Sequence, residues 1–226
     1  MTSLVPLPQS KNDRFTEGRL HVALLVSFAG LLTWSAIGPY DQFTWFLEVL
    51  PALLALILLA ATYRKFPLTS LAYVLIWFHA VILTVGGHYT YAEMPLFNWL
   101  RDTFALSRNY YDRLGHFVQG FVPAIITREL LLRTSPLQRG KWLFTIVVSI
   151  CLAISASYEL FEWGVAVATG TAADAFLGTQ GDVWDTQWDM ALALVGAVTS
   201  LVIFGSLHDS FLRKLPVKNS SRIISS

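Results

Sequence analysis

Long apolar runs separated by short polar connections dominate the pattern of hydrophobic and polar positions along the chain. A helix needs about 20 apolar residues to cross the hydrocarbon core of a bilayer. Six runs qualify, over residues 20–38, 43–62, 68–88, 113–133, 141–169 and 189–207. The strict alternation of a barrel strand is absent, so backbone groups within the membrane must be satisfied inside helices. The pattern predicts an all-α fold, a polytopic membrane helical bundle with about six transmembrane helices.

The same pattern divides the chain into three parts. Residues 1–19 form a polar N-terminal tail, residues 20–207 a six-span transmembrane domain, and residues 208–226 a polar C-terminal tail. The first apolar run is longer than the apolar region of a typical signal peptide and has no A-x-A-like exit. We therefore interpret it as a retained first span.

Composition supports the membrane class and excludes others. Of 226 residues, 54% are hydrophobic and 14% charged, which is too apolar for an ordinary soluble domain. The net charge of +1 comes without a clustered basic patch, so nucleic acid is not an expected partner. Cys151 is the single cysteine and can form neither an intrachain disulfide nor a cysteine metal site. The expected partner is the lipid bilayer, and the oligomeric state is left open.

Lys and Arg are distributed unequally between the two sets of connections. Both tails and the connections 63–67 and 134–140 are basic, whereas connections 39–42 and 170–188 contain no Lys or Arg. Because basic residues concentrate on the cytoplasmic side of membrane proteins, we expect both termini in the cytoplasm.

The long connection between the third and fourth runs contains a helix signal. Pro95 fits the first turn of a short helix whose apolar and polar residues fall on different faces. Such a helix either covers the site from the membrane surface or is an ordinary amphipathic connector.

Ionisable residues gather in the half of the spans that this topology places outside. They are His88, Asp112, His116, Glu159, Glu162 and Asp189. An ionised side chain in a membrane costs a few kcal/mol unless it is paired, solvated or neutralised, and it usually faces the protein interior. We therefore expect an outward-facing pocket lined by acids and histidines between the third and sixth spans, with few cationic partners besides Arg113.

Two short spacings point to chemistry. Asp112 and His116 are four residues apart, and Glu159 and Glu162 are three apart, so each pair shares a helix face. A carboxylate beside an imidazole fixes its tautomer in general-base chemistry and behind metal-bound histidines. Glu159, Glu162 and Asp189 are the candidate catalytic acids or bases.

The cofactor is left open. With two histidines nearby, a divalent metal ion such as Zn²⁺ or Mn²⁺ fits these residue types, whereas ligation by carboxylates alone would favour Mg²⁺ or Ca²⁺. The candidate metal ligands are His88, Asp112, His116 and Glu159. The spacing matches neither an EF-hand loop nor an H-E-x-x-H motif. The sequence leaves open whether Asp182, Asp185 and Glu48 belong to the site.

Three functions remain open from the residues alone. The first is an enzyme acting on an envelope lipid or a lipid-linked substrate. The second is a non-catalytic protein that binds or transports a cation or proton. The third is a structural assembly partner, in which the glutamates brace the bundle and Asp189 caps a helix.

Four segments carry a resemblance to a known family. They are GGHYTYAEMP (86–95), NYYDRLGHFVQGFVPA (109–124), SYELFEWG (157–164) and GDVWDTQWDMALALVGA (181–197). Together they resemble the YjdF-like family of bacterial inner-membrane proteins, whose function is unassigned. The resemblance implies a multi-pass protein of the bacterial inner membrane and no particular reaction.

A fainter similarity is to VanZ-like membrane proteins, which are linked with the cell envelope. Their D-K-x-x-H-F, E-x-x-Q and D-x-x-x-N-x-x-G motifs are matched in part by Asp112 with His116, by Glu159 and by Asp189, with Arg113 in place of the Lys.

Overall fold

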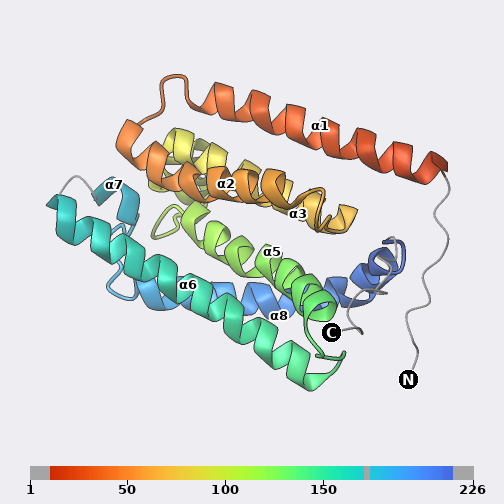
Figure 1. Cartoon of the computed structure of the whole chain (residues 1–226). Coiled ribbons are helices and arrows are strands. Elements are labelled where there is room, and N and C mark those ends of the chain that lie inside the picture. Colours follow the sequence, from red (N-terminus) through yellow and green to blue (C-terminus); the bar gives the residue numbers. More distant parts are fainter. Residues whose placement is uncertain (1–10, 171–173, 216–226) are drawn as a thin grey trace.

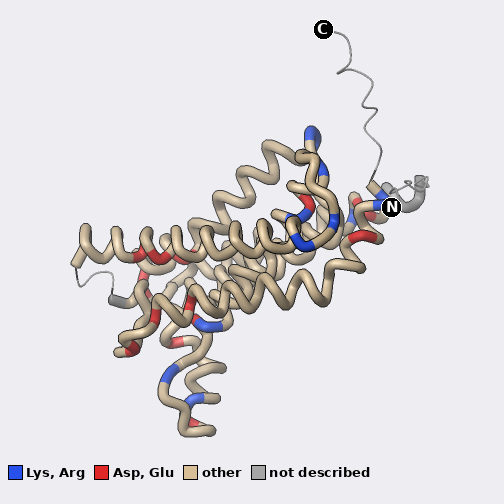
Figure 2. The backbone as a smooth tube through the Cα atoms, turned by 90° about the horizontal axis from the view of Figure 1, so that it is seen from below, with Lys and Arg blue, Asp and Glu red and all other residues tan. Residues whose placement is uncertain are grey.

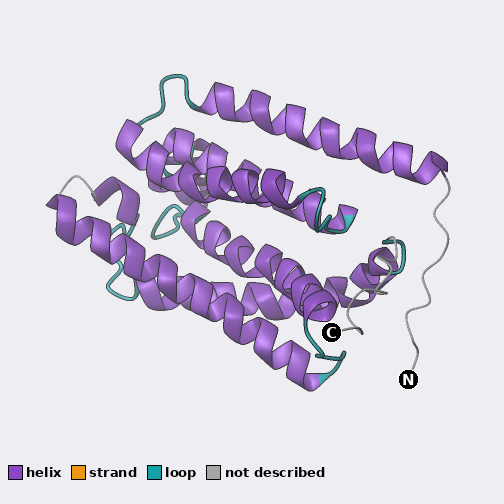
Figure 3. Ribbon diagram, viewed as in Figure 1, coloured by secondary structure: helices purple, strands orange, loops and turns teal. Residues whose placement is uncertain are grey.

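The computed structural model describes residues 11–170 and 174–215. Within them the chain is helical, and Figure 3 shows helices joined by loops with no strand in these ranges. The elements are α1 (Lys11–Ser35), α2 (Gln42–Thr62), α3 (Ser70–Tyr89), η1 (Tyr91–Glu93), α4 (Pro95–Phe104), α5 (Tyr111–Thr134), α6 (Lys141–Thr169), α7 (Asp174–Leu177) and α8 (Asp185–Leu212).

The predicted membrane helical bundle is confirmed. In the described part of the chain, α1, α2, α3, α6 and α8 are long and apolar enough to cross a membrane. The sixth expected span, α5, has 24 residues and at about 1.5 Å per residue is long enough to cross, but it carries charges near both ends. It lies inside the bundle against α3, α6 and α8 (Figure 1). Neighbouring helices thus cover the charges that make α5 too polar for a lipid-exposed span.

Two glycines set the closest helix contact. A Cβ atom at Gly120 of α5 would overlap the carbonyl of Ala193, and one at Gly196 of α8 would overlap the carbonyl of Phe117. The backbones of α5 and α8 therefore touch, as small residues at a membrane helix interface permit. Further along α8, Gly205 has no neighbouring atom within 4 Å among the described residues.

The bundle has two chemically different ends. We call the end where α1, α3 and α6 finish and α2, α5 and α8 begin the acidic end, and the opposite end the basic end. Figure 2 shows acidic residues on α6 toward the first end and a basic loop between α5 and α6 at the second. The predicted tails lie partly within helices, because α1 begins at Lys11 and α8 ends at Leu212. Residues 1–10 and 216–226 lie outside the described residues.

A buried polar cluster ties α3, α5 and α8 together at the basic end. Glu129, fully buried, accepts hydrogen bonds from the backbone and hydroxyl of Thr69 and from Arg133 at 2.6 Å. Arg128 donates to Nδ1 of His208 at 2.9 Å, so Nε2 of His208 carries the proton that it shares with Glu129 at 3.1 Å. Glu129 and Arg133 thus form an ion pair one helical turn apart in a buried setting.

The short helix expected at Pro95 is present at the acidic end. Pro95 occupies the first turn of α4, and Phe97 packs its ring against Tyr111 with 5.3 Å between centroids. Leu96, Trp99 and Phe104 remain more than half exposed. One aromatic side chain thus attaches α4 to α5, while its other apolar side chains are available to the membrane surface.

Candidate functional site

The site is built on the first turns of α5. Asp112 and His116, one turn apart, are 6% and 5% exposed. Nε2 of His116 lies 3.4 Å from Oδ1 of Asp112, and Nδ1 lies 3.0 Å from Oε1 of Gln119. The helical spacing therefore places the two side chains as the sequence predicts, and the imidazole has a polar neighbour at each nitrogen.

Two other helices bring carboxylates to the same imidazole. Oε1 of Glu159, on α6, lies 3.7 Å from Nδ1 of His116, and Oδ1 of Asp189, in the first turns of α8, lies 3.9 Å from Nε2. Oε1 of Glu159 is buried without a hydrogen-bond partner among the described residues. Three helices thus converge on His116.

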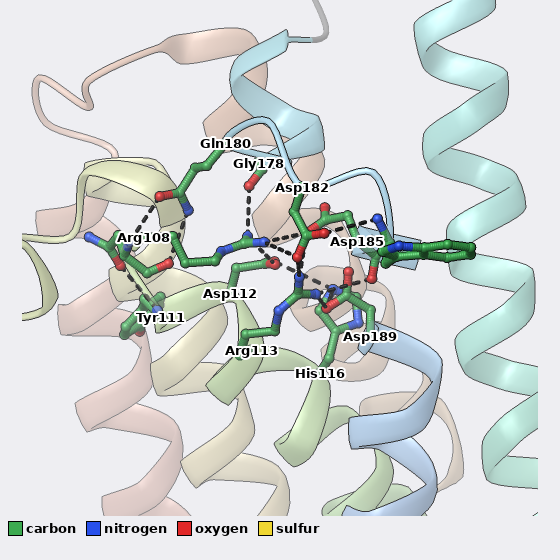
Figure 4. Close-up of polar contacts among 12 residues, drawn as sticks. Arg108, Tyr111, Asp112, Arg113, His116, Gly178, Gln180, Asp182, Asp185 and Asp189 are labelled. Carbon is green, nitrogen blue, oxygen red and sulfur yellow. Dashed lines mark hydrogen bonds and ion pairs between the residues drawn. The ribbon is translucent and has the colours of Figure 1, made fainter. Parts of the chain in front are cut away.

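Arg113 links this group to the loop before α8. Its guanidinium pairs with Asp189, with Asp185 at 2.7 Å and with Asp182 at 3.0 Å (Figure 4). Asp182 and Asp185, whose membership the sequence left open, therefore belong to the charged network.

Arg108 is a member that sequence reasoning missed. It contacts Asp185 at 2.6 Å, Asp112 at 3.4 Å and the carbonyl of Gly178 at 3.0 Å, and it is 6% exposed. Arg108 precedes α5 in a loop without periodicity, so no helical pattern could place it. The sequence feature that could have indicated its contact with Asp112 was the spacing of four residues between them.

Gln180 holds the loop that supplies Asp182. Its side chain accepts a hydrogen bond from the backbone N–H of Asn109 at 2.8 Å and donates one to the carbonyl of Asn109 at 3.0 Å. Its φ of 49° is in the left-handed region, which disfavours non-glycine residues. Two hydrogen bonds thus offset a strained backbone and join the two loops that carry Arg108 and Asp182.

Carboxylates outnumber cations in this network. The acids are Asp112, Asp182, Asp185, Asp189 and Glu159, and the guanidinium groups are those of Arg108 and Arg113. Even a protonated His116 leaves an excess of negative charge when all the acids are ionised. Crowded acids in such a setting either share protons or bind a cation.

A cavity of about 340 Å³ adjoins the network on the side of α2 and α6. Its polar lining consists of Glu48, His79, Tyr91, Asp112, His116, Gln119, Ser157, Tyr158 and Glu162. Glu48, undecided from sequence, is 4% exposed and belongs to this wall. Burial raises the pKa of Tyr91, in η1, well above its usual range, so its hydroxyl stays protonated. Glu162 reaches the cavity, and Glu159 reaches the imidazole.

His88 is not brought to the site. Its Nδ1 donates to the carbonyl of Ser35 at 3.0 Å, and its ring lies 4.3 Å from that of Trp34, so it is held by the end of α1. The preceding glycines explain this, because Gly87 faces Val49 of α2 and Gly86 faces Tyr91. Each residue turns about 100° around a helix, so His88 points elsewhere. The expectation that His88 is a metal ligand is corrected accordingly.

Three side chains have a geometry that suits a metal ion. One donor atom each from Asp112, His116 and Asp189 lie within 4.8 Å of one another, and all three residues are buried. Tetrahedral ligands at about 2.0–2.2 Å from a metal are about 3.3–3.6 Å apart. The 3.4 Å and 3.9 Å separations around Nε2 of His116 require only small side-chain shifts to reach that range.

Comparisons with known proteins agree with the membrane fold. Residues 20–210 match the profile of the family described as "Predicted membrane protein (DUF2238)". The chain is 48% identical over 184 residues to the inner membrane protein YjdF of Escherichia coli (strain K12), covering 81% of this chain and 88% of that protein. No solved structure matches. The VanZ-like similarity is not shown by these comparisons and stays a prediction.

Proposed function

The chain belongs to the DUF2238 family of predicted membrane proteins, and we infer its function from the geometry of its own site. We propose that it is an inner-membrane protein that binds one divalent metal ion through Asp112, His116 and Asp189. We further propose that it is an enzyme that uses this ion on an envelope lipid or a lipid-linked molecule.

The observation that carries the proposal is the donor triad beside a cavity. Donor atoms of Asp112, His116 and Asp189 lie within 4.8 Å of one another, and two of these residues also line the cavity. One imidazole with two carboxylates is a ligand set that suits Zn²⁺ or Mn²⁺. Three protein ligands leave at least one coordination position for water or substrate, as in catalytic metal sites.

Neighbouring residues have roles that fit this chemistry. A bound metal polarises a substrate oxygen or lowers the pKa of a bound water. Glu159, whose Oε1 lacks a hydrogen-bond partner among the described residues, is placed beside His116 to act as a base. Arg113 and Arg108 fix the orientations of Asp189 and Asp112, as outer-shell partners do for metal ligands.

Two observations support the proposed location: the similarity to an inner membrane protein, and the distribution of basic residues between the two ends of the bundle. The relative that is 48% identical is called an inner membrane protein. The basic connections lie at the end opposite the site, and by the positive-inside rule this supports cytoplasmic termini and an acidic end that faces outwards. A reporter fused after residue 215 tests this, and a non-cytoplasmic reporter would reverse the orientation.

A second candidate is a protein that binds a cation or proton without catalysis. The excess of carboxylates over guanidinium groups in the network favours it, because such an excess suits any cation. It differs from the first candidate in requiring no lipid substrate, so cation binding that is independent of added lipid together with no lipid turnover would favour it.

Metal stoichiometry tests the proposal. We expect the purified protein, dialysed against Zn²⁺ or Mn²⁺, to retain about one ion per chain. His116→Ala and Asp189→Asn should lose it, whereas His88→Ala, which removes a histidine outside the site, should retain it. Empty wild-type protein, or equal loss in His88→Ala, would refute the proposed site.

A further inference from the structure

We infer that the cavity admits a membrane lipid with an amine-bearing headgroup, which enters sideways from the bilayer between α2 and α6. This inference deepens the proposed function, since it names the class of lipid on which the metal site would act. It rests on the opening of the cavity, on the apolar side chains within it and on the charges of its wall.

The cavity opens on the flank of α6. Ile154 and Phe161 line it and are also 40% and 39% exposed, and Ser157 between them is exposed as well. The opposite wall is formed by Glu48 and Pro51 of α2. Since α2 and α6 are both membrane spans, the side chains at this opening face the position of lipid.

The acidic end of the cavity is covered. The short helix α7 contacts both α2 and α6 and lies beside the end of α6 in Figure 1. Phe176 of α7 is 3% exposed and packs against Tyr158 and Phe161, with 6.4 Å and 6.1 Å between ring centroids. This packing favours a route from the bilayer over one from the aqueous side.

Part of the cavity lining suits hydrocarbon. Pro51, Leu83, Pro123 and Ile154 contribute apolar surface from four different helices. The volume of about 340 Å³ is within the usual range for ligand pockets, about 300–1,000 Å³. It accommodates a headgroup and the first part of an acyl chain, while the rest of the chain extends through the opening into the bilayer.

The wall selects the headgroup by charge. Glu48 and Glu162 line the cavity, and among the described side chains neither has a cationic partner within 4 Å. Among the described residues, the lining includes His79 and His116 but no Lys or Arg. Arg108 and Arg113 are engaged by the aspartates.

An ammonium group fits such a wall. It donates charge-assisted hydrogen bonds to the glutamate carboxylates, and it makes cation–π contacts with the aromatic rings of Tyr158 and Phe161. In the metal-free protein, a headgroup with only negative charge would meet the carboxylates of Glu48 and Glu162. The imidazole of His116 in the same lining is already shared with Asp112, Glu159 and Asp189. The lining thus favours aminophospholipids, such as phosphatidylethanolamine, over phosphatidylglycerol.

Native mass spectrometry of protein released from vesicles tests the headgroup. Vesicles contain equal amounts of phosphatidylethanolamine and phosphatidylglycerol, and a chelator removes metal. We expect bound phosphatidylethanolamine to exceed phosphatidylglycerol about tenfold in the wild type. Glu48→Gln and Glu162→Gln should each reduce this ratio severalfold, whereas Glu93→Gln, an exposed acid outside the cavity, should not. Using two separate variants keeps the test valid if one of them fails to fold.

Equal binding of the two lipids, preference for phosphatidylglycerol, or an unchanged ratio in both cavity variants would overturn the inference. Because metal is absent from this assay, its outcome is independent of the metal stoichiometry. A protein that selects the amine lipid but binds no metal would refute the proposed function alone.

The route is tested at the opening. Ile154→Trp places a larger side chain where the cavity meets the bilayer and should slow exchange of the bound lipid. Ile203→Trp on α8 is a matched control, because Ile203 is 61% exposed and does not line the cavity. An equal exchange rate in the two variants would exclude entry between α2 and α6.

Discussion

Nε2 of His116 lies 3.4 Å from Oδ1 of Asp112, one turn earlier on the same buried helix. This pair is the centre to which α6 contributes Glu159 and α8 contributes Asp189. The contact between α5 and α8 at Gly120 and Gly196 lies in the turns after the pair, so helix packing and site geometry depend on each other.

Removing Arg108 should destabilise the protein strongly. Arg108→Ala leaves Asp185 and Asp112 buried with one cationic partner fewer, and breaking a buried pair in this way costs about 3–5 kcal/mol. We expect a clearly lower apparent melting temperature in detergent. Arg101→Ala is the control, because its ion pair with Asp102 is at the surface, where such pairs contribute little. Equal effects would show that the buried network is not stabilising.

Gln180→Ala should loosen the loop that presents Asp182. The variant loses two hydrogen bonds to Asn109, each worth about 0.5–1.5 kcal/mol, while the residue keeps an unfavourable positive φ. We expect faster hydrogen exchange in residues 178–182 and a modest loss of stability. Gln138→Ala, in the exposed α5–α6 loop, should change neither quantity. Unchanged exchange in Gln180→Ala would contradict the assigned role.

Gly196→Ala and Gly205→Ala should have opposite effects on stability although both residues lie on α8. The first should destabilise the protein and the second should stabilise it. The added Cβ at Gly196 would overlap the carbonyl of Phe117, whereas at Gly205 no atom of the described residues lies within 4 Å. Overpacking costs about 1–3 kcal/mol or more, while alanine in an open helical position gains up to about 1 kcal/mol over glycine. Thermal unfolding of the two variants checks the backbone contact between α5 and α8, and similar melting temperatures would argue against it.

Glu159→Gln should weaken metal binding without abolishing it. Glu159 lies at Nδ1 of His116, on the opposite ring nitrogen from the proposed metal, and such outer-shell groups typically change metal affinity by about 10–100-fold. Titration with Zn²⁺ should therefore still reach about one ion per chain at higher concentration. A variant that binds no ion at any concentration would make Glu159 a direct ligand.

The sequence predicted most of the fold because membrane helices leave a direct signal. Residues 141–169 form α6 with the expected bounds, and α3 begins two residues later than the predicted span. The start of α1 at Lys11 was not predicted, because the polar residues before the apolar run carry no membrane signal. The bounds of an apolar run mark the membrane, and a helix can continue beyond it.

The site was predictable where one helix fixed the geometry. Asp112 and His116 follow from their spacing, whereas His88 shows that position along a span does not determine the face on which a side chain lies. For His88, that face depends on how Gly86 and Gly87 pack against neighbouring helices. A single sequence does not reveal this packing. Arg108 was missed because its place depends on contacts with the distant loop at Gly178 and Asp185.

The most direct test of the account is the ligand environment of a bound metal. X-ray absorption spectroscopy of the Zn²⁺-loaded protein should show one histidine nitrogen together with oxygen ligands at about 2.0–2.2 Å. The nitrogen signal should be lost in His116→Ala and retained in His88→Ala. A spectrum without a histidine ligand in the wild type, or one that is unchanged in His116→Ala, would contradict a metal site formed by Asp112, His116 and Asp189.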